Sequence, residues 1–318
     1  MHYDIFIPPR EINIYISYTV QVLFHEILGL ETTETIFLAE ECLEDLLTLP
    51  ITSGLSVSGL DFDKSIVIRD LGMAFHMLQP AECWIILTDK YSQNKFVSQN
   101  HEFNNKNKIY KSVDTTEISF IQALIEYLAI SLSEGLLCEK CDVEKELVNT
   151  NERNKRLQLV LDSVIPKDMN LLEICCGDGI ATQALLELGH NPWCMDQDRC
   201  DICQSLRFRK LDPRRSFVLD ARYLGKFFPS DSFDVVLGFM VGLIDEYNWF
   251  SWREILLASS CLARHMVLFT VYSYREAEII AKSLDQAGWN GHILDNRDSK
   301  GIYDQWIYIG KKNERKGY

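Results

Sequence analysis

The sequence predicts an α/β protein in two parts: a doubly wound, mostly parallel seven-stranded sheet in the second half, preceded by a separate acidic domain of α/β or α+β type. Three observations lead to this prediction. Seven short apolar runs alternate with amphipathic segments after residue 168. The chain has 318 residues, enough for about two domains. Its net charge of −14 is concentrated in residues 1–150, which carry 23 acidic and 10 basic side chains.

The first half mixes strand and helix patterns. A polar stretch at 92–114, rich in Asn and Lys, predicts a long loop that could serve as a lid. In the helix that follows, Ile121 and Ile125 belong to an apolar series at helical spacing, and Asp114 with Glu117 resembles a capping box. The expected strands are 4–7, 35–39, 65–70 and 83–88, and the expected helices are 17–30 and 117–132.

A highly charged segment with few apolar positions, 142–166, predicts an exposed helix that links two domains. The acidic N-terminal domain would then cover 1–141 and the second domain 167–318. Beyond the linker the expected strands are 170–175, 192–196, 216–220, 233–239, 265–272, 291–295 and 305–310, with helices between most of them.

The stretch LLEICCGDGIA, 171–181, lies where the first strand of the second domain turns into a helix. Gly177 and Gly179 permit a sharp turn and a close approach of backbone to ligand. A dinucleotide fingerprint requires a third glycine three residues later, and Thr182 stands there instead. The pattern therefore argues against a pyrophosphate site, and Glu173 at the strand tip offers a carboxylate.

Glu173 followed by Gly177 and Gly179 resembles motif I of the class I S-adenosylmethionine-dependent methyltransferases, which have a Rossmann-like fold. In that family the acidic residue meets the amino group of the cofactor's methionine part, and the glycine loop passes beneath the cofactor. The first glycine of the family's pattern is replaced by Cys175 in this sequence. The resemblance implies S-adenosyl-L-methionine as the cofactor.

Later motifs extend the resemblance across the second half. Asp196 lies 19 residues after Gly177, at the position where the family binds the ribose hydroxyls, with Gln197 next to it. The stretch VLDARYLGKFFPSDSFDVVLGF is similar to the third and fourth motifs of the family. By that similarity the adenine and the end of the fourth strand would be bordered by Asp220, Ala221, Gly238 and Phe239.

The sequence assigns no catalytic residue. Methyl transfer from a sulfonium is a displacement that needs alignment, and a general base only where the acceptor must lose a proton. The Asn/Asp-Pro-Pro-Tyr motif of amino-methylating nucleic-acid enzymes is absent, and LGFMVGLIDEYNWF stands in that region. Weak candidates for acceptor contact are Asp245, Tyr247, His265 and Tyr272, followed by Glu246, Tyr274 and Tyr303.

Three functions stay open. The favoured one is methylation of a protein side chain or a small molecule, with the acidic domain selecting the acceptor. An RNA methyltransferase is the second, although the acidic first half repels phosphate and the only basic cluster is RFRKLDPRR, 207–215. The third is a partner-binding module without chemistry. For the first domain, dimerisation or scaffolding is the alternative role.

The ten cysteines, two of them adjacent, are typical of reduced thiols rather than of a disulfide framework. Two Cys-x-x-Cys pairs occur, Cys138/Cys141 and Cys200/Cys203, and their wide separation favours thiols without a ligand over a shared metal site. No stretch reaches about 18 apolar residues and the first residues lack a signal-peptide pattern. We therefore expect a cytoplasmic protein without bound metal.

Overall fold

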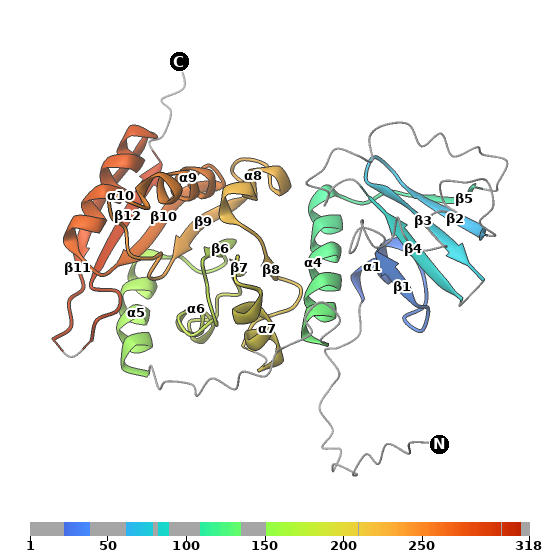
Figure 1. The fold of residues 1–318 in the computed structure, drawn as a ribbon, viewed down its shortest axis with the longest axis horizontal. Helices are drawn as coiled ribbons and strands as arrows, with labels where there is room; N and C mark the ends of the chain where they lie inside the picture. Colours follow the sequence, from blue (N-terminus) through green and yellow to red (C-terminus); the bar gives the residue numbers. More distant parts are fainter. Residues whose placement is uncertain are drawn as a thin grey trace, which may run out of the picture.

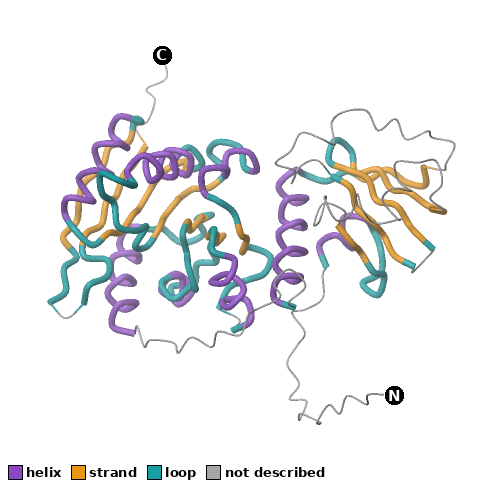
Figure 2. Tube along the Cα trace, viewed as in Figure 1, coloured by secondary structure: helices purple, strands orange, loops and turns teal. Residues whose placement is uncertain are grey.

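A computed structural model describes residues 22–38, 62–78, 82–88, 109–134, 151–208, 210–299 and 301–312. These residues form two sheets, with one long helix between them (Figure 1). The same arrangement is visible in the trace of Figure 2, where each sheet lies beside its own helices. The expected strand at 4–7 and the pair Cys138/Cys141 lie outside the described residues.

The first sheet has five strands in the order β1-β4-β3-β2-β5. Buried apolar residues on its strands, such as Ile66 and Ile86, form one core with Phe24 and Leu28 of helix α1. The elements are α1 (Leu23–Leu28), β1 (Ile36–Leu38), β2 (Phe62–Ile68), β3 (Gly72–Met77), β4 (Cys83–Leu87) and β5 (Ile109–Val113).

Three sequence expectations for this part need correction. Strand β3 was not predicted; it pairs antiparallel with both β2 and β4. Residues 109–113, expected within a loop, form β5, because parallel pairing with β2 satisfies the backbone of a segment whose own pattern is polar. The N-cap of the next helix is Thr116, whose side chain accepts a hydrogen bond from the Ser119 amide at 3.1 Å, so the capping box at Asp114 is wrong.

Helix α4 (Glu117–Ser133) lies between the two sheets (Figure 1). On one side Phe120 and Leu124 join the core of the first sheet. On the other side Ile121 and Ile125 join the core of the second sheet, and Leu132 packs farther along it. A helix that is apolar around most of its circumference is buried on more than one side, as α4 is.

The second sheet has seven strands in the order β11-β12-β10-β9-β6-β7-β8. Five of them pair in parallel, whereas β12 is antiparallel to both β10 and β11, so the sheet is mixed. The strands are β6 (Leu171–Ile174), β7 (Trp193–Asp196), β8 (Ser216–Val218), β9 (Phe233–Gly238), β10 (Ala263–Val271), β11 (Trp289–Asp295) and β12 (Trp306–Lys312).

The strand order reverses at β6. The chain runs from β6 outward to β7 and β8, then returns to pair β9 with the other side of β6. In an open α/β sheet this switch point leaves a crevice at the carboxyl ends of the strands, where ligands bind. The carboxyl ends of β6 and β9 therefore mark the place to look for a site.

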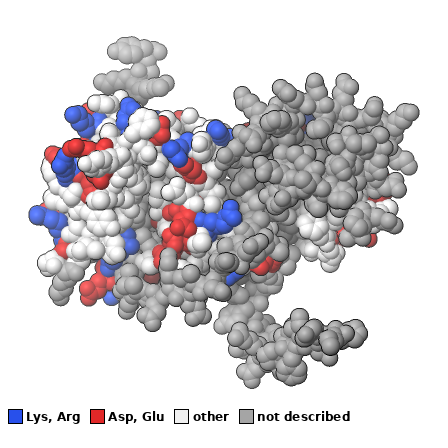
Figure 3. Space-filling view, viewed as in Figure 1, with Lys and Arg blue, Asp and Glu red and all other residues white. Residues whose placement is uncertain are grey.

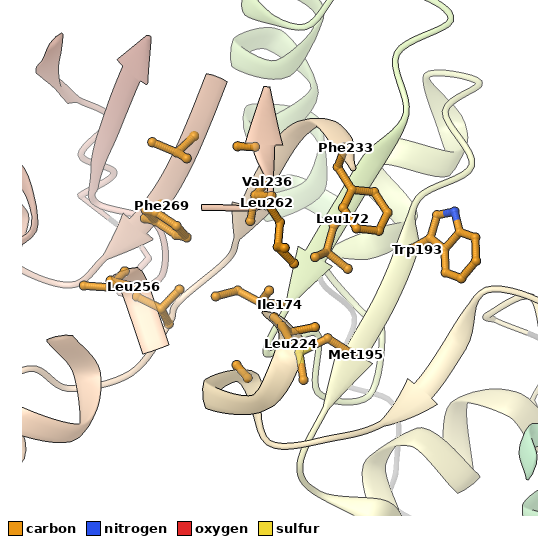
Figure 4. Close-up of a cluster of buried hydrophobic side chains, with 14 of the residues drawn as sticks. Leu172, Ile174, Trp193, Met195, Leu224, Phe233, Val236, Leu256, Leu262 and Phe269 are labelled. Atoms are coloured by element: carbon orange, nitrogen blue, oxygen red, sulfur yellow. The ribbon is translucent and has the colours of Figure 1, made fainter. Parts of the chain in front are cut away.

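Helices cover both faces of this sheet. One face packs against α8 (Leu224–Phe227), α9 (Trp249–Ser260) and α10 (Tyr274–Gln286) through the aliphatic and aromatic cluster drawn in Figure 4, which includes Leu172, Ile174 and Val236. The other face packs against α5 (Asn151–Val164) and α6 (Thr182–Glu187). Helix α7 (Arg199–Arg207) packs beside α4, and a short 3-10 helix, η2 (Ala221–Tyr223), follows β8.

Helix α5 coincides with the charged segment that predicted a linker. Its Leu157 and Leu161 are each 1% exposed and pack on the second sheet with Ala184 and Leu185 of α6. Two buried leucines four residues apart form only a narrow apolar stripe, but this stripe packs the helix onto the sheet. The division of the chain into domains at 141 and 167 remains a prediction.

Candidate active site

The turn after β6 is the most constrained part of the switch point. Cys175, Gly177 and Gly179 have φ angles of 53°, 54° and 72°, all in the left-handed region. The Cys176 amide donates to the Met195 carbonyl at 3.1 Å, which holds the turn against β7. Glycine adopts this region freely, whereas a residue with a Cβ is strained there, so Cys175 stands where the backbone favours a glycine.

Glu173 is fully buried and lies on the face of the sheet covered by α5 and α6. The Cys194 thiol donates to its Oε2 at 3.9 Å, while its Oε1 accepts no hydrogen bond of normal geometry from the described residues, the nearby Thr182 hydroxyl included. Burial raises the pKa of Glu173 to about 8, although Thr182 and the positive charge of Arg153 act to lower it. A buried carboxyl with a free oxygen is suited to meeting a cation.

Asp196 ends β7 and holds the turn directly. Its carboxylate accepts from the Gly177 amide at 2.9 Å and from the Asp198 amide at 2.8 Å. Burial raises the pKa of Asp196, and those two amides oppose the shift. Gln197, the next residue, is exposed in the bend before α7.

Asp220 follows β8 and caps η2. Its side chain accepts from the Arg222 amide at 3.0 Å and forms a two-pronged ion pair with the Arg222 guanidinium, with the shorter contact at 2.5 Å. The Arg222 side chain lowers the pKa of Asp220, which stays ionised. Ala221 beside it is buried in the core.

Carboxylates lie at or just after the ends of three neighbouring strands, at the edge of the sheet where the turn lies. The pKa of the Cys175 thiol is raised to about 12, first by burial and then by the negative charges of Asp196, Asp220 and Glu173. Of the three acids, Asp196 contacts the turn directly, through the Gly177 amide at 2.9 Å. The parallel strands β6, β7 and β8 bring three acids that are 23 and 24 residues apart in sequence to the same edge of the sheet.

The end of β9 closes the other side of the crevice. A side chain on Gly238 would meet a Val241 methyl group at 2.6 Å and the Ile174 carbonyl at 3.2 Å, so β6 and the loop after β9 leave no room for one. Phe239 is buried on the face covered by α5 and α6.

A buried polar network behind the site was missed by sequence reasoning. Asp304 is fully buried and accepts from Arg153 Nε at 2.6 Å and from Thr270 Oγ1 at 2.5 Å. Thr270 Oγ1 in turn accepts from the Met240 amide at 2.7 Å. Arg153 thus joins α5 to the ends of β9 and β10, close to Glu173. Arg153 and Asp304 are 151 residues apart, and the only sequence signal was two ionisable residues in segments interpreted as a linker and a strand edge.

The candidates for acceptor contact separate into two groups. Tyr272, just after β10, lies at the carboxyl edge of the sheet, with its ring 6.3 Å from that of Tyr303, and burial raises its pKa. Asp245 and Tyr247 lie in the loop between β9 and α9, where Asp245 accepts from the Tyr247 amide at 2.9 Å. Of these, Tyr247 is 98% exposed.

His265 is not brought to the site. It lies near the start of β10, at the amino edge of the sheet, where its Nε2 is 3.7 Å from Asp234 Oδ1. The candidate crevice is at the opposite edge, because β9 and β10 run in parallel. The structure therefore places His265 beside Asp234 at the surface, at the edge of the sheet opposite the three carboxylates.

The basic cluster at 207–215 is largely engaged within the chain. Arg214 pairs with Glu126 at 3.0 Å, Lys210 Nζ donates to the Asp178 carbonyl at 3.4 Å, and Arg215 donates to the Asn191 carbonyl at 2.9 Å. Arg209 lies outside the described residues. On the face shown in Figure 3, acidic and basic side chains are intermixed wherever residues are coloured.

Two further absences apply to the described residues alone. They contain no group of three or more His, Cys, Asp or Glu side chains that could hold a metal. Of the pair Cys200/Cys203, Cys200 is exposed and Cys203 is buried, so the two thiols do not face the same surroundings. None of the described helices combines the length and apolarity needed to cross a bilayer.

Comparison with solved structures places the likeness over about half of the chain. A methyltransferase from Clostridium acetobutylicum shares 14% identity over 52% of this chain and 92% of its own, with a TM-score of 0.39. Magnesium protoporphyrin IX methyltransferase from Synechocystis, with bound SAM, shares 13% identity over 62% of this chain and 98% of its own, with a TM-score of 0.40. A didemethyltoxoflavin methyltransferase from Burkholderia thailandensis, with bound S-adenosylhomocysteine, shares 16% identity over 63% of this chain and 92% of its own, with a TM-score of 0.41.

These three neighbours are S-adenosylmethionine-dependent methyltransferases. No protein-family model matches the chain, and no curated protein matches its sequence. All three TM-scores lie below 0.5, so the proposal below rests on this chain's own sheet and side chains.

Proposed function

We propose that the chain binds S-adenosylmethionine in the crevice at the carboxyl ends of β6, β7, β8 and β9 and transfers its methyl group to an acceptor. The observation that carries the proposal is the position of Glu173, Asp196 and Asp220 at or just beyond the carboxyl ends of β6, β7 and β8, where Asp196 accepts from the Gly177 amide of the turn at 2.9 Å. A cofactor with a cationic sulfonium and an ammonium group suits a site built from carboxylates.

Glu173 supplies the test of fit. Its Oε1 is buried and accepts no hydrogen bond of normal geometry from any residue that the structure describes, and its raised pKa keeps the carboxyl mostly protonated at neutral pH. An ammonium group at this position would provide the missing partner and favour the ionised carboxyl. Asp196 keeps capacity for two ribose hydroxyls beyond the two amides that it already accepts from. The residues present therefore fit the group.

The work of the protein residues would be binding and alignment. When bound, the cofactor supplies an activated methyl group, and the reaction is an in-line displacement. Glu173, Asp196 and the amides of the turn would fix the methionine and ribose parts, and the packed side chains around Gly238 would exclude water behind them. No proton transfer is needed unless the acceptor carries a proton that must leave.

For the acceptor we propose a protein side chain or a small molecule held at the carboxyl edge beside Tyr272 and Tyr303. These rings lie 6.3 Å apart, and the Arg153 guanidinium lies 4.9 Å from the centre of the Tyr303 ring. Tyr272→Phe is the sharpest variant, because it removes one hydroxyl and keeps the ring. A loss of transfer with unchanged cofactor affinity would place the hydroxyl at the acceptor.

Cofactor titration by calorimetry, with wild type and with Asp196→Asn, tests the proposal first. We expect wild type to bind and Asp196→Asn to bind about tenfold or more weakly, because a charge-assisted contact to the ribose is lost. Asp231→Asn is the matched control: Asp231 lies in a half-exposed turn before β9, at the opposite edge of the sheet, where it pairs with Lys312. A wild-type chain that does not bind the cofactor would overturn the proposal.

Labelled cofactor incubated with a cell extract then identifies the acceptor class. Label in protein or in small molecules supports the favoured function. Label that is confined to RNA would favour the second hypothesis, which has little support from the engaged arginines at 207–215. Binding without any transfer of label would indicate a module without chemistry.

A further inference from the structure

We propose that the groove between α9 and α10 binds a small molecule that carries an oxyanion, a carboxylate or a phosphate, on an apolar or aromatic body. The groove has a volume of about 440 Å³, within the range of small-molecule sites. It is lined by Asp245, Glu246, Trp249, Arg253, Ile279, Lys282, Ser283 and Gln286. None of the cofactor-binding candidates is among these residues, so the inference does not rest on the proposed function.

Ser283 gives the first observation. It is 6% exposed, and its Oγ has no hydrogen-bond partner among the described residues. Serines inside helices usually donate to a carbonyl three or four residues earlier, as Ser259 on α9 does to Ile255 at 2.7 Å. The Ser283 hydroxyl lacks that bond and lines the groove, so it is available to a group that enters.

The charged side chains that line the groove give the second observation. Its two acids are already engaged: Asp245 accepts from the Tyr247 and Asn248 amides at 2.9 and 3.0 Å, and Glu246 pairs with Arg275 at 3.2 Å. The side chains of Arg253 and Lys282 make no hydrogen bond or ion pair with any residue that the structure describes. These two cations are therefore available to an oxyanion that enters the groove.

The remaining lining residues define the rest of the ligand. Trp249 and Ile279 are half-buried in the core beneath and present apolar surface between the two helices. Arg253 follows Trp249 by one helical turn, and Lys282 follows Ile279 by three residues. A ligand that places its ring or chain on the apolar pair would bring its anion to the cations and to Ser283.

Four probes titrated into the purified full chain by calorimetry or ligand-observed NMR test this. Phenyl phosphate and benzoate represent the two anions, benzyl alcohol lacks the charge, and inorganic phosphate lacks the apolar body. We expect at least one aromatic anion to bind with a dissociation constant near or below about 1 mM, and the other two probes about tenfold more weakly. No binding by either aromatic anion, or equal binding by benzyl alcohol or inorganic phosphate, would overturn the proposal.

Variants locate the binding. The double variant Arg253→Glu with Lys282→Glu should weaken the aromatic anion about tenfold or more, and Ser283→Ala should weaken it a few-fold. Lys155→Glu, exposed on α5 at the other face of the sheet, is the matched charge control and should bind as wild type. Unchanged affinity in the double variant would place the anion elsewhere and refute the groove.

S-adenosylmethionine titrated into the same samples separates the two proposals. We expect the groove variants to retain the affinity of wild type for that cofactor, because their substitutions lie outside the crevice. A chain that binds the aromatic anion in the groove but not the cofactor would leave this inference standing and remove the proposed function. A chain that binds the cofactor but neither aromatic anion would remove this inference and leave the proposed function standing.

Discussion

The carboxylate of Glu126, in the middle of α4, accepts a hydrogen bond from Arg214 Nε at 3.0 Å, on the loop before β8. Its other oxygen accepts from the Val22 and Leu23 amides, at 2.9 and 2.7 Å, where α1 begins. The side chain is 2% exposed. One buried carboxylate therefore ties α1 of the first sheet and a loop of the second sheet to the same helix.

Replacing Glu126 with Ala should destabilise the whole chain. The change leaves two amides without their acceptor and Arg214 without its partner, which together cost about 3 kcal/mol or more. Urea unfolding measures the loss. Glu134→Ala, at the exposed end of the same helix, should stay within about 0.5 kcal/mol of wild type, and an equally mild effect of Glu126→Ala would contradict the role assigned to it.

Glu173 should make stability depend on pH. Its pKa is raised from 4.5 to about 8, so the folded state holds a proton that the unfolded state releases. The stabilisation from that proton is fully present below about pH 4.5 and is lost as the pH rises through 8, a difference on the order of a few kcal/mol. Thermal unfolding of wild type and Glu173→Gln between pH 5 and about 9 measures it, with exposed Glu278→Gln as control. Parallel pH curves for wild type and Glu173→Gln would be the contrary result.

The same carboxyl should couple cofactor binding to proton release. If an ammonium group binds beside Glu173, the carboxyl ionises, and up to about one proton leaves at pH 7. Calorimetry in two buffers of different ionisation enthalpy counts that proton. Glu173→Gln should bind more weakly and release none from this position. Proton release that is equal in wild type and the variant would mean that another group titrates.

Cys175→Gly should stabilise the turn, by about 1 kcal/mol, because it removes a Cβ from a left-handed backbone with φ of 53°. Cofactor affinity should be retained. The same substitution at Cys261, where φ is −61°, is the control and should be neutral or destabilising. Thermal unfolding compares the two, and a destabilising Cys175→Gly would show that packing of the thiol outweighs the strain.

Asp304→Asn should cost about 3 to 5 kcal/mol, because it breaks a buried pair and leaves the Arg153 charge without its partner. Asp298→Asn, which is 30% exposed and pairs with Arg156 at 2.7 Å, is the control and should cost less than about 1 kcal/mol. Urea unfolding distinguishes them. Equal losses would mean that burial of the Asp304 pair contributes nothing special.

The sequence predicted the parts of the fold that local pattern specifies. Strands β6, β7, β9 and β10 were predicted because they are continuous apolar runs, and the turn at Gly177 because glycine marks a left-handed backbone. Strand β5 and the seating of α5 were missed, because in each case a distant partner supplies the pairing or the packing that the segment's own pattern does not show.

The site follows the same division. Glu173, Asp196 and Asp220 could be named because each lies at or just after the end of a recognisable strand, in a stretch that resembles a motif of the methyltransferase family. Arg153, Asp304 and the Glu126 pair could not, because nothing in a single sequence reports which ionisable residues meet across 88 or 151 positions. His265 was named on residue type alone, and its strand carries it to the wrong edge of the sheet.

The shared position of α4 determines where the polypeptide can be divided. A recombinant fragment that starts at the expected boundary near 142 would discard the helix and bare the apolar surface of Phe217, Ile202 and Leu206, which favours aggregation. A fragment that starts at about residue 115 would keep that surface covered, but would expose Phe120 and Leu124 instead. Any shortened chain for crystallisation therefore needs polar substitutions on the apolar surface that it exposes, whichever end is removed.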